Sequence, residues 1–421
     1  MSTSGPSSKT PDFERHLDRL AEVAIGAGLG LKAGQELVIT ATLDAVPLVR
    51  RITKHAYKAG ATLVTTFYTD EESSLLRFQY GAEAGFDTAA SWLYEGMAQA
   101  YRSGAARLAV TGNDPSLFSK QDPEKVSRAN RAMSKAYRPA LELITRHDIN
   151  WTIVASATPA WAAAMFPDLS LDEAMARLWH AIFAASRVDR ADPVAAWKEH
   201  DAKLHARADY LNEKRYHTLH FKGPGTDLRV GLADNHLWLG GGTTAHNGCY
   251  CIPNMPTEEV FTTPHKDRVD GFVTSTKPLS YQGTLIEEIC VKFEGGKIVD
   301  AKAKRGGEVL QKMIETDEGA RRLGEVALVP HSSPIAASGL LFLNTLFDEN
   351  AACHIALGQA YSSCVKDGDS LKPDELAARG ANTSLIHVDW MIGSNKIDVD
   401  GVSATGEASP MIRAGEWAGD R

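Results

Sequence analysis

Helical and strand-like patterns alternate over the first 155 residues of the chain, and this alternation most constrains the fold. Apolar residues recur at helical spacing over 12–28, 45–59 and 87–103. Short apolar runs suited to buried strands lie at 36–41, 62–67, 107–111 and 151–155. Strands that alternate with helices are typical of a parallel sheet. We therefore predict an α/β fold whose N-terminal part is a doubly wound, mostly parallel α/β domain.

The pattern changes after a helical stretch at about 170–213. From Tyr216 onward, short strand-like segments are separated by glycine and proline, which predicts a β-rich second domain with few helices. The expected organisation is a disordered tail over 1–11, an N-terminal α/β domain over 12–213 and a C-terminal β-rich catalytic domain over 214–421.

Composition excludes several classes of protein. The chain has 421 residues, of which 43% are hydrophobic and 23% charged, as in globular proteins. Its net charge of −8 argues against nucleic-acid or anionic-membrane partners. No apolar run is long enough to cross a bilayer, and the five scattered cysteines suggest reduced thiols in a cytosol. The expected location is cytoplasmic.

Two short motifs, one rich in glycine and one with two cysteines, are weak evidence for a binding site. Gly26-Ala-Gly28-Leu-Gly30 resembles a phosphate loop, but it follows a helix and precedes a strand, whereas the dinucleotide motif needs the opposite order. Cys249-Tyr-Cys251 lacks a second cysteine pair at metal-binding spacing, so buried thiols are the favoured interpretation.

Polar side chains inside apolar segments of the second half predict a metal site. His387 and Asp389 are two residues apart, so a strand places both on one face, with Cα atoms about 6–7 Å apart. An ionised carboxylate amid Leu-Ile-x-Val-x-Trp-Met-Ile is costly unless a positive charge meets it. Glu259, Glu325 and His354 pose the same problem, and borderline cations such as Zn²⁺ and Co²⁺ accept imidazole and carboxylate together.

Each of these residues also has an ordinary structural explanation. A buried histidine more often bonds to the backbone than to a metal. Glu325 could form a salt bridge at a helix end, and Glu258 with Glu259 could be a solvated pair in a loop. The spacing of these residues alone therefore does not decide between a metal site and the structural explanations.

Taken together and in order, four segments resemble the M29 family of metallo-aminopeptidases, the aminopeptidase T and aminopeptidase S group. They are Pro256-Thr-Glu-Glu259-Val-Phe-Thr, Gly324-Glu325-Val-Ala-Leu-Val, His354-Ile-Ala-Leu-Gly and His387-Val-Asp389. The resemblance covers nearly the whole chain. It implies a dinuclear site with Glu259, Glu325, His354, His387 and Asp389 as ligands of two divalent metal ions, Co²⁺, Zn²⁺ or Mg²⁺. It also implies a homodimer that acts on peptide substrates.

The expected reaction is release of N-terminal residues by a water that the two ions activate. Glu325 is the predicted bridging ligand, and Tyr361 the predicted hydrogen-bond donor to the oxyanion. Glu258 is a weaker candidate for a general base or an anchor for the substrate amine. The alternatives are another metal-dependent dipeptidase or amide hydrolase, and a non-enzymatic ligand-binding α/β protein with a structural metal.

Overall fold

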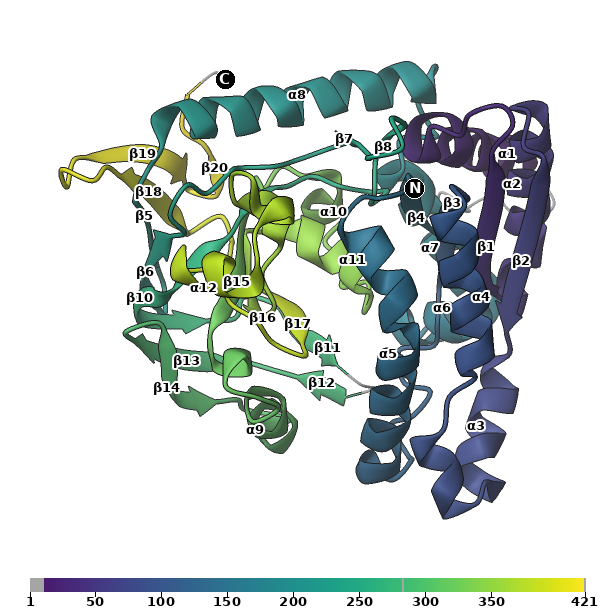
Figure 1. The fold of residues 1–421 in the computed structure, drawn as a ribbon, viewed down its shortest axis with the longest axis horizontal. Coiled ribbons are helices and arrows are strands. Elements are labelled where there is room, and N and C mark those ends of the chain that lie inside the picture. Colours follow the sequence, from purple (N-terminus) through teal and green to yellow (C-terminus); the bar gives the residue numbers. More distant parts are fainter. Residues whose placement is uncertain (1–10, 282–283, 420–421) are drawn as a thin grey trace. The chain divides into compact units, whose positions relative to one another are not determined.

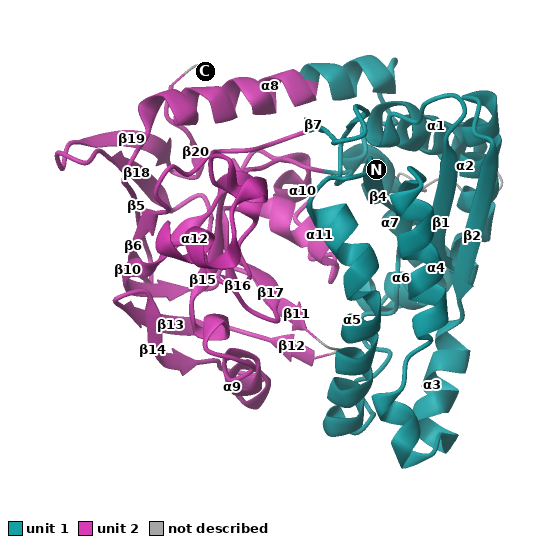
Figure 2. Ribbon diagram, viewed as in Figure 1, with its two compact units in different colours: residues 1–199, 242–256 teal, residues 200–241, 257–421 magenta. Residues whose placement is uncertain are grey.

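A computed structural model describes residues 11–281 and 284–419. The chain forms two compact units, coloured separately in Figure 2: residues 1–199 with 242–256, and residues 200–241 with 257–421. The chain passes from unit 1 to unit 2 inside helix α8 (Pro193–Lys214), before the boundary predicted near residue 213. The predicted tail lies outside the described residues apart from Pro11, at which α1 begins.

Unit 1 contains a four-stranded parallel sheet with the order β2-β1-β3-β4. Its strands are β1 (Glu36–Thr42), β2 (Leu63–Thr69), β3 (Ala106–Thr111) and β4 (Trp151–Ala155). Its helices are α1 (Pro11–Val23), α2 (Val46–Lys58), α3 (Glu71–Tyr80), α4 (Ser91–Arg102), α5 (Pro123–Thr145), α6 (Pro159–Met165), α7 (Leu171–Ala185) and the start of α8 (Figure 1).

Helices cover both faces of this sheet because its strands are apolar on both sides. Leu37, Val38 and Ile39 are consecutive and all buried, although neighbouring strand residues point to opposite faces. Val38 packs in one cluster with residues of α4 and α5. The predicted parallel α/β part is confirmed.

The glycine-rich segment ends the first helix. Residues Ala24–Leu29 continue α1 as a π-helix, η1, and Gly30 closes it in the left-handed region at φ 57°. Strand β1 follows, so the order is helix, glycines, strand, as the sequence indicates. A Cβ atom at Gly30 would lie 1.9 Å from the carbonyl oxygen of Tyr250, so only glycine fits this close approach.

Residues 242–256 belong to unit 1 because polar contacts attach them there. They carry the short strands β7 (Thr243–Thr244) and β8 (Tyr250–Cys251). The fully buried Asn150 accepts a hydrogen bond from Asn247 at 3.0 Å and donates one to the Leu29 carbonyl at 2.8 Å. Cys249 and Cys251 are buried thiols.

Unit 2 is built mainly from two antiparallel sheets. The larger has the order β14-β13-β10-β6-β5-β18-β19-β20, and the smaller has the order β17-β16-β15-β9. The larger sheet consists of β5 (Thr218–Gly223), β6 (Thr226–Leu232), β10 (Pro264–Thr274), β13 (Cys290–Glu294), β14 (Lys297–Lys302), β18 (Asp398–Val402), β19 (Ala408–Arg413) and β20 (Glu416–Trp417). The smaller consists of β9 (Val260–Thr262), β15 (Leu323–Leu328), β16 (His354–Gly358) and β17 (His387–Met391).

The remaining elements of unit 2 are short. They are the hairpin β11 (Leu279–Tyr281) with β12 (Thr284–Ile286), the helices α9 (Gly307–Ile314), α10 (Pro334–Ala337), α11 (Thr345–Asp348) and α12 (Pro373–Ala378), and several single 3₁₀ turns. The β-rich character predicted for the second half is confirmed. No helix in the described ranges has both the length and the apolar composition needed to span a bilayer.

One core joins the two sheets of unit 2. Val326, Ile355 and Trp390 of the smaller sheet belong to the same buried cluster as Phe221 and Val230 of the larger sheet. Since strand residues alternate, the intervening residues of β15, β16 and β17 point to the opposite face of the smaller sheet. That face carries the predicted site.

Replacing Asn150 with alanine is expected to destabilise unit 1 by about 1–3 kcal/mol, because it leaves the buried Leu29 carbonyl without its donor. Urea unfolding followed by circular dichroism measures this loss. The exposed Asn395→Ala serves as the control and is expected to change the midpoint little. An unchanged midpoint in Asn150→Ala would contradict the role of this amide.

Candidate metal centre

The small sheet of unit 2 aligns the predicted ligands through its register. Glu325 pairs with Ala356, and Ala356 pairs with Asp389, so these three residues form one row across β15, β16 and β17. His354 and His387 lie two residues away from this row on their own strands and share its face. All four polar side chains therefore project from the face opposite the apolar core.

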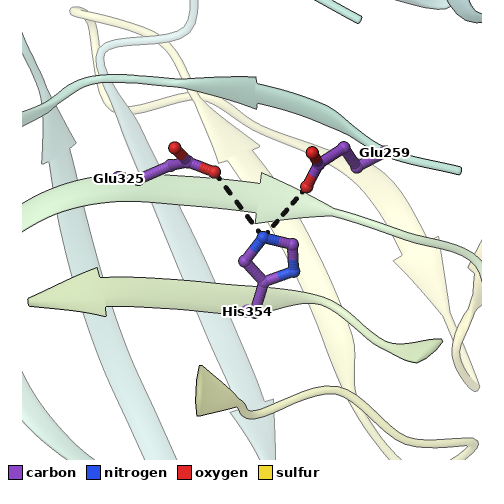
Figure 3. Close-up of side chains that lie close together, drawn as sticks. All are labelled: Glu259, Glu325 and His354. Carbon is purple, nitrogen blue, oxygen red and sulfur yellow. Dashed lines mark ion pairs between the residues drawn. The ribbon is translucent and has the colours of Figure 1, made fainter. Parts of the chain in front are cut away.

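Glu259 joins this face from the neighbouring strand. It immediately precedes β9, whose Phe261 pairs with Ala327 on the same side of the sheet. The Oε2 atom of Glu259 lies 2.9 Å from His354 Nε2, and Figure 3 shows the two side chains converging with that of Glu325. Glu258 and Glu259 are each only 6% exposed, so they are not a solvated pair.

Two groups of potential metal donors share Glu325. The first group is Glu259, Glu325 and His354, and the second is Glu325, His387 and Asp389; the donor atoms of each group lie within 4.8 Å of one another. Glu325 Oε1 is 3.6 Å from His354 Nε2, whereas its Oε2 is 3.6 Å from His387 Nε2. Each oxygen of one carboxylate thus faces a different imidazole.

These separations fit divalent cations. Donor atoms about 2.1 Å from one tetrahedral ion are roughly 3.4 Å apart. The separations between the donors here are 2.9 to 3.6 Å, including 3.4 Å from His387 Nε2 to Asp389 Oδ2. In addition, Asp389 Oδ1 is buried and has no hydrogen-bond partner among the described residues.

Backbone carbonyls orient both imidazoles for this purpose. His354 Nδ1 is 3.1 Å from the Ala352 carbonyl, and His387 Nδ1 is 2.7 Å from the Gln359 carbonyl. A carbonyl oxygen only accepts, so each Nδ1 carries the hydrogen and the Nε2 lone pair can face a cation.

The cluster stabilises positive charge. Burial lowers the pKa of His387, but the charge and hydrogen bond of Asp389, together with the charge of Glu325, outweigh burial and raise this pKa to about 10. Burial would raise the pKa of Asp389, and the contact with His387 lowers it instead. Burial, opposed by the contact with His354, raises the pKa of Glu325 to about 7. Without a bound metal ion, the imidazoles keep protons whose positive charge stabilises the neighbouring carboxylates. Divalent cations would supply the same positive charge in place of those protons.

Glycine 324 lets Glu325 take its place in the row. The pairing of β15 with β16 shifts between Leu323 and Glu325, which makes Gly324 the extra residue of a β-bulge. A Cβ atom there would lie 2.3 Å from the Gln359 carbonyl oxygen, so the close approach requires glycine.

Tyr361 lies beside the donor groups. Its ring is 4.9 Å from the ring of His387 and 6.1 Å from that of Phe261. Burial, followed by the charges of Glu325 and Asp389, raises the pKa of Tyr361 well above its usual value. The phenol therefore stays protonated at working pH and is available as a hydrogen-bond donor.

The structure adds a buried acidic segment that the sequence analysis did not single out. Glu349 and Asn350, in the turn η5 (Glu349–Ala351) before β16, are 9% and 0% exposed. Asn350 Oδ1 accepts a hydrogen bond of 2.6 Å from the backbone N–H of Glu258, which fixes the segment that carries Glu259. The polar run Asp348-Glu349-Asn350 between apolar residues was an available sequence signal.

Glu258 points to a different partner. Its Oε2 atom lies 3.5 Å from His200 Nε2, and that same nitrogen lies 2.7 Å from the Thr257 carbonyl. Glu258 belongs to neither donor group.

Known proteins are similar to this chain over almost its whole length. Residues 13–417 match the family described as thermophilic metalloprotease (M29). Aminopeptidase T of Thermus thermophilus is 54% identical over 405 residues, which cover 96% of this chain and 99% of that protein. Aminopeptidase 2 of Geobacillus stearothermophilus is 44% identical, with 96% and 98% coverage.

A solved structure agrees with the fold as well. The structure of wild-type AmpT from Thermus thermophilus superimposes with a TM-score of 0.91 at 53% identity, covering 96% of this chain and 99% of that chain. The predicted α/β fold and the predicted enzyme class, a metal-dependent hydrolase of peptides, are therefore confirmed. The family match, the related sequences and the solved structure agree, and this chain belongs to the M29 family of metallopeptidases.

Proposed function

We propose that the protein is an aminopeptidase that uses two divalent cations to release N-terminal residues from peptides. The observation that carries this proposal is the position of Glu325, whose two carboxylate oxygens face the imidazoles of two different donor groups. A carboxylate placed in this way would offer one oxygen to each of two ions in a two-metal hydrolytic site. The relatives named aminopeptidase support the choice of a free N-terminus as the substrate feature.

In this proposal Glu259 and His354 would hold one ion, His387 and Asp389 would hold the other, and Glu325 belongs to both donor groups. Bound there, divalent ions would lower the pKa of a water and polarise the scissile carbonyl. The carbonyls of Ala352 and Gln359 keep the two rings oriented. Whether the native ions are Co²⁺, Zn²⁺ or Mg²⁺ depends on supply as well as on these donors.

Tyr361 supports the reaction as a hydrogen-bond donor. Its neutral phenol belongs to the ring that lies next to His387, a member of the second donor group. A fixed donor stabilises the negative charge that develops on the carbonyl oxygen during attack. Phe261 contacts the ring of Tyr361 edge-on and limits its orientations.

The predictions of a cytoplasmic location and a homodimer extend this proposal. A dipeptidase or other amide hydrolase is the second enzymatic candidate, since the same donor groups would serve it. Substrates that differ only at the N-terminus separate an aminopeptidase from an amide hydrolase that accepts blocked amines.

Hydrolysis of amino-acid p-nitroanilides is expected to stop after chelation and to return when Co²⁺, Zn²⁺, Mn²⁺ or Mg²⁺ is added. The matched N-acetylated anilides are expected to remain intact, because an aminopeptidase needs the free amine. Release of p-nitroaniline measures both results. Equal hydrolysis of free and acetylated substrates would contradict the aminopeptidase and favour another amide hydrolase.

Ala356→Leu is expected to reduce the metal content of the purified protein by at least one ion per chain. Ala356 lies between Glu325 and Asp389 in the row, so a larger side chain enters the space between their carboxylates. Elemental analysis after dialysis measures the content. Ile355→Leu alters the opposite face of the same strand and is the control, with its metal content expected to be unchanged. Full metal content in Ala356→Leu would count against this geometry.

Tyr361→Phe is expected to leave metal content unchanged and to lower kcat roughly 100-fold, as for other single oxyanion donors. Steady-state kinetics on a leucine anilide, together with elemental analysis, provide the measurement. Tyr210→Phe on α8 removes a phenol elsewhere in unit 2 and should retain kcat. A wild-type kcat in Tyr361→Phe would rule out the proposed hydrogen bond.

A further inference from the structure

A row of residues with apolar side chains leads away from the first donor group across the small sheet of unit 2. Ala327 of β15 pairs with His354 of β16 on one side and with Phe261 of β9 on the other. Residues that lie directly opposite each other on neighbouring strands share a face of the sheet. The ring of Phe261 therefore projects on the face that carries the donors, two residues after Glu259.

Leu239 extends this row beyond the edge of the sheet. Its backbone N–H donates to the Phe261 carbonyl at 3.0 Å, and the N–H of Phe261 donates to the Leu239 carbonyl at 2.9 Å. Two residues that exchange both hydrogen bonds lie opposite each other, with their side chains on one face. Gly240 keeps this segment close, because a Cβ atom there would lie 2.8 Å from the Glu259 carbonyl oxygen. Leu239 and Phe261 thus form one apolar surface next to Glu259.

This apolar surface is separate from the core of unit 2. The chain neighbours Trp238 and Val260 are buried in the core that joins the two sheets. Phe261 and Leu239 belong neither to that core nor to the side chains packed against it, and both stay partly exposed. The ring of Phe261 instead lies 6.1 Å from that of Tyr361. A partly exposed aromatic ring beside a group of polar donors is typical of the wall of a binding site.

The position of this surface suits one part of an aminopeptidase substrate. The side chain of the N-terminal residue branches from the Cα atom that lies between the free amine and the scissile carbonyl. When that carbonyl meets the donor groups, the side chain must lie directly beside them. On the donor face, Ala327 and Ala356 are too small to enclose a side chain, and Met391 is only 3% exposed. Phe261 has both the size and the exposure that this contact needs.

We propose that Phe261 and Leu239 form an apolar wall that binds the side chain of the substrate's N-terminal residue, so that peptides beginning with leucine are preferred to those beginning with alanine. This inference rests on the proposed aminopeptidase function and adds the class of N-terminal residue that the site selects. An apolar wall discriminates through the substrate surface that it removes from water. One additional methylene group in such a pocket changes kcat/KM roughly 10-fold to 200-fold.

The test compares the p-nitroanilides of leucine and alanine, both with a free amine, on the same metal-loaded enzyme. Wild type is expected to hydrolyse the leucine anilide with a kcat/KM roughly tenfold or more above that of the alanine anilide. Phe261→Ala is expected to lower this ratio about tenfold, with the metal content unchanged. The ratio is measured because a shift of Tyr361, which Phe261 contacts, would slow both substrates alike.

Phe272→Ala makes the same substitution at a 48% exposed position of β10 and is the matched control, with the wild-type ratio expected. Leu239→Ala removes the other half of the wall and is expected to lower the ratio as well. It decides the question by itself if Phe261→Ala does not fold, which circular dichroism checks. A wild-type ratio of about one, or a ratio that neither substitution in the wall changes, would overturn the inference.

Failure of the proposed function gives a different result. Wild-type hydrolysis of both free-amine anilides is recorded first, and its absence would reject the aminopeptidase itself. Hydrolysis of both anilides at equal kcat/KM would leave the aminopeptidase standing and reject only the apolar wall.

Discussion

The placement of negative charge against an apolar core is the constraint on which the rest of unit 2 depends. Val326, Ile355 and Trp390 commit one face of the small sheet to the core. Strand alternation then commits Glu325, His354 and Asp389 to the opposite face, although each is less than 10% exposed. A row of acids that is both buried and backed by a core is stable only with positive charge beside it. The imidazoles supply part of that positive charge. Their Nδ1 atoms face backbone carbonyls, so their Nε2 atoms can face cations that supply the rest.

Several apparently separate features serve this one row. The bulge at Gly324 sets the register of Glu325, the small side chain of Ala356 leaves space between two carboxylates, and Asn350 fixes the backbone before Glu259. None of these three residues is itself a predicted ligand. Their common effect is to hold the potential donors of β15, β16 and β17, and Glu259 just before β9, at separations that suit divalent cations.

Sequence reasoning predicted much of this because the local patterns were strong. The strand starting at His387 has alternating character, and its two-residue spacing correctly places His387 and Asp389 on one face. The parallel part of unit 1 follows from four apolar runs separated by helical periods. The helical stretch predicted over 170–213 is interrupted, because α7 ends at Ala185 and α8 begins at Pro193. The burial of Glu349 was not predicted, because an acidic residue in a turn is typical of solvent-exposed loops, although the polar run Asp348-Glu349-Asn350 between apolar residues was an available signal.

The sequence by itself determined where apolar strands and helices lie and which side chains share a strand face, because these properties depend on neighbours along the chain. It also carried the ordered motifs of the M29 family. Only the tertiary structure decided that Glu325 faces two imidazoles, that residues 242–256 pack with unit 1 and that Glu349 is buried. Those facts depend on the pairing of strands and turns that are far apart in the chain, and local sequence patterns do not specify such distances.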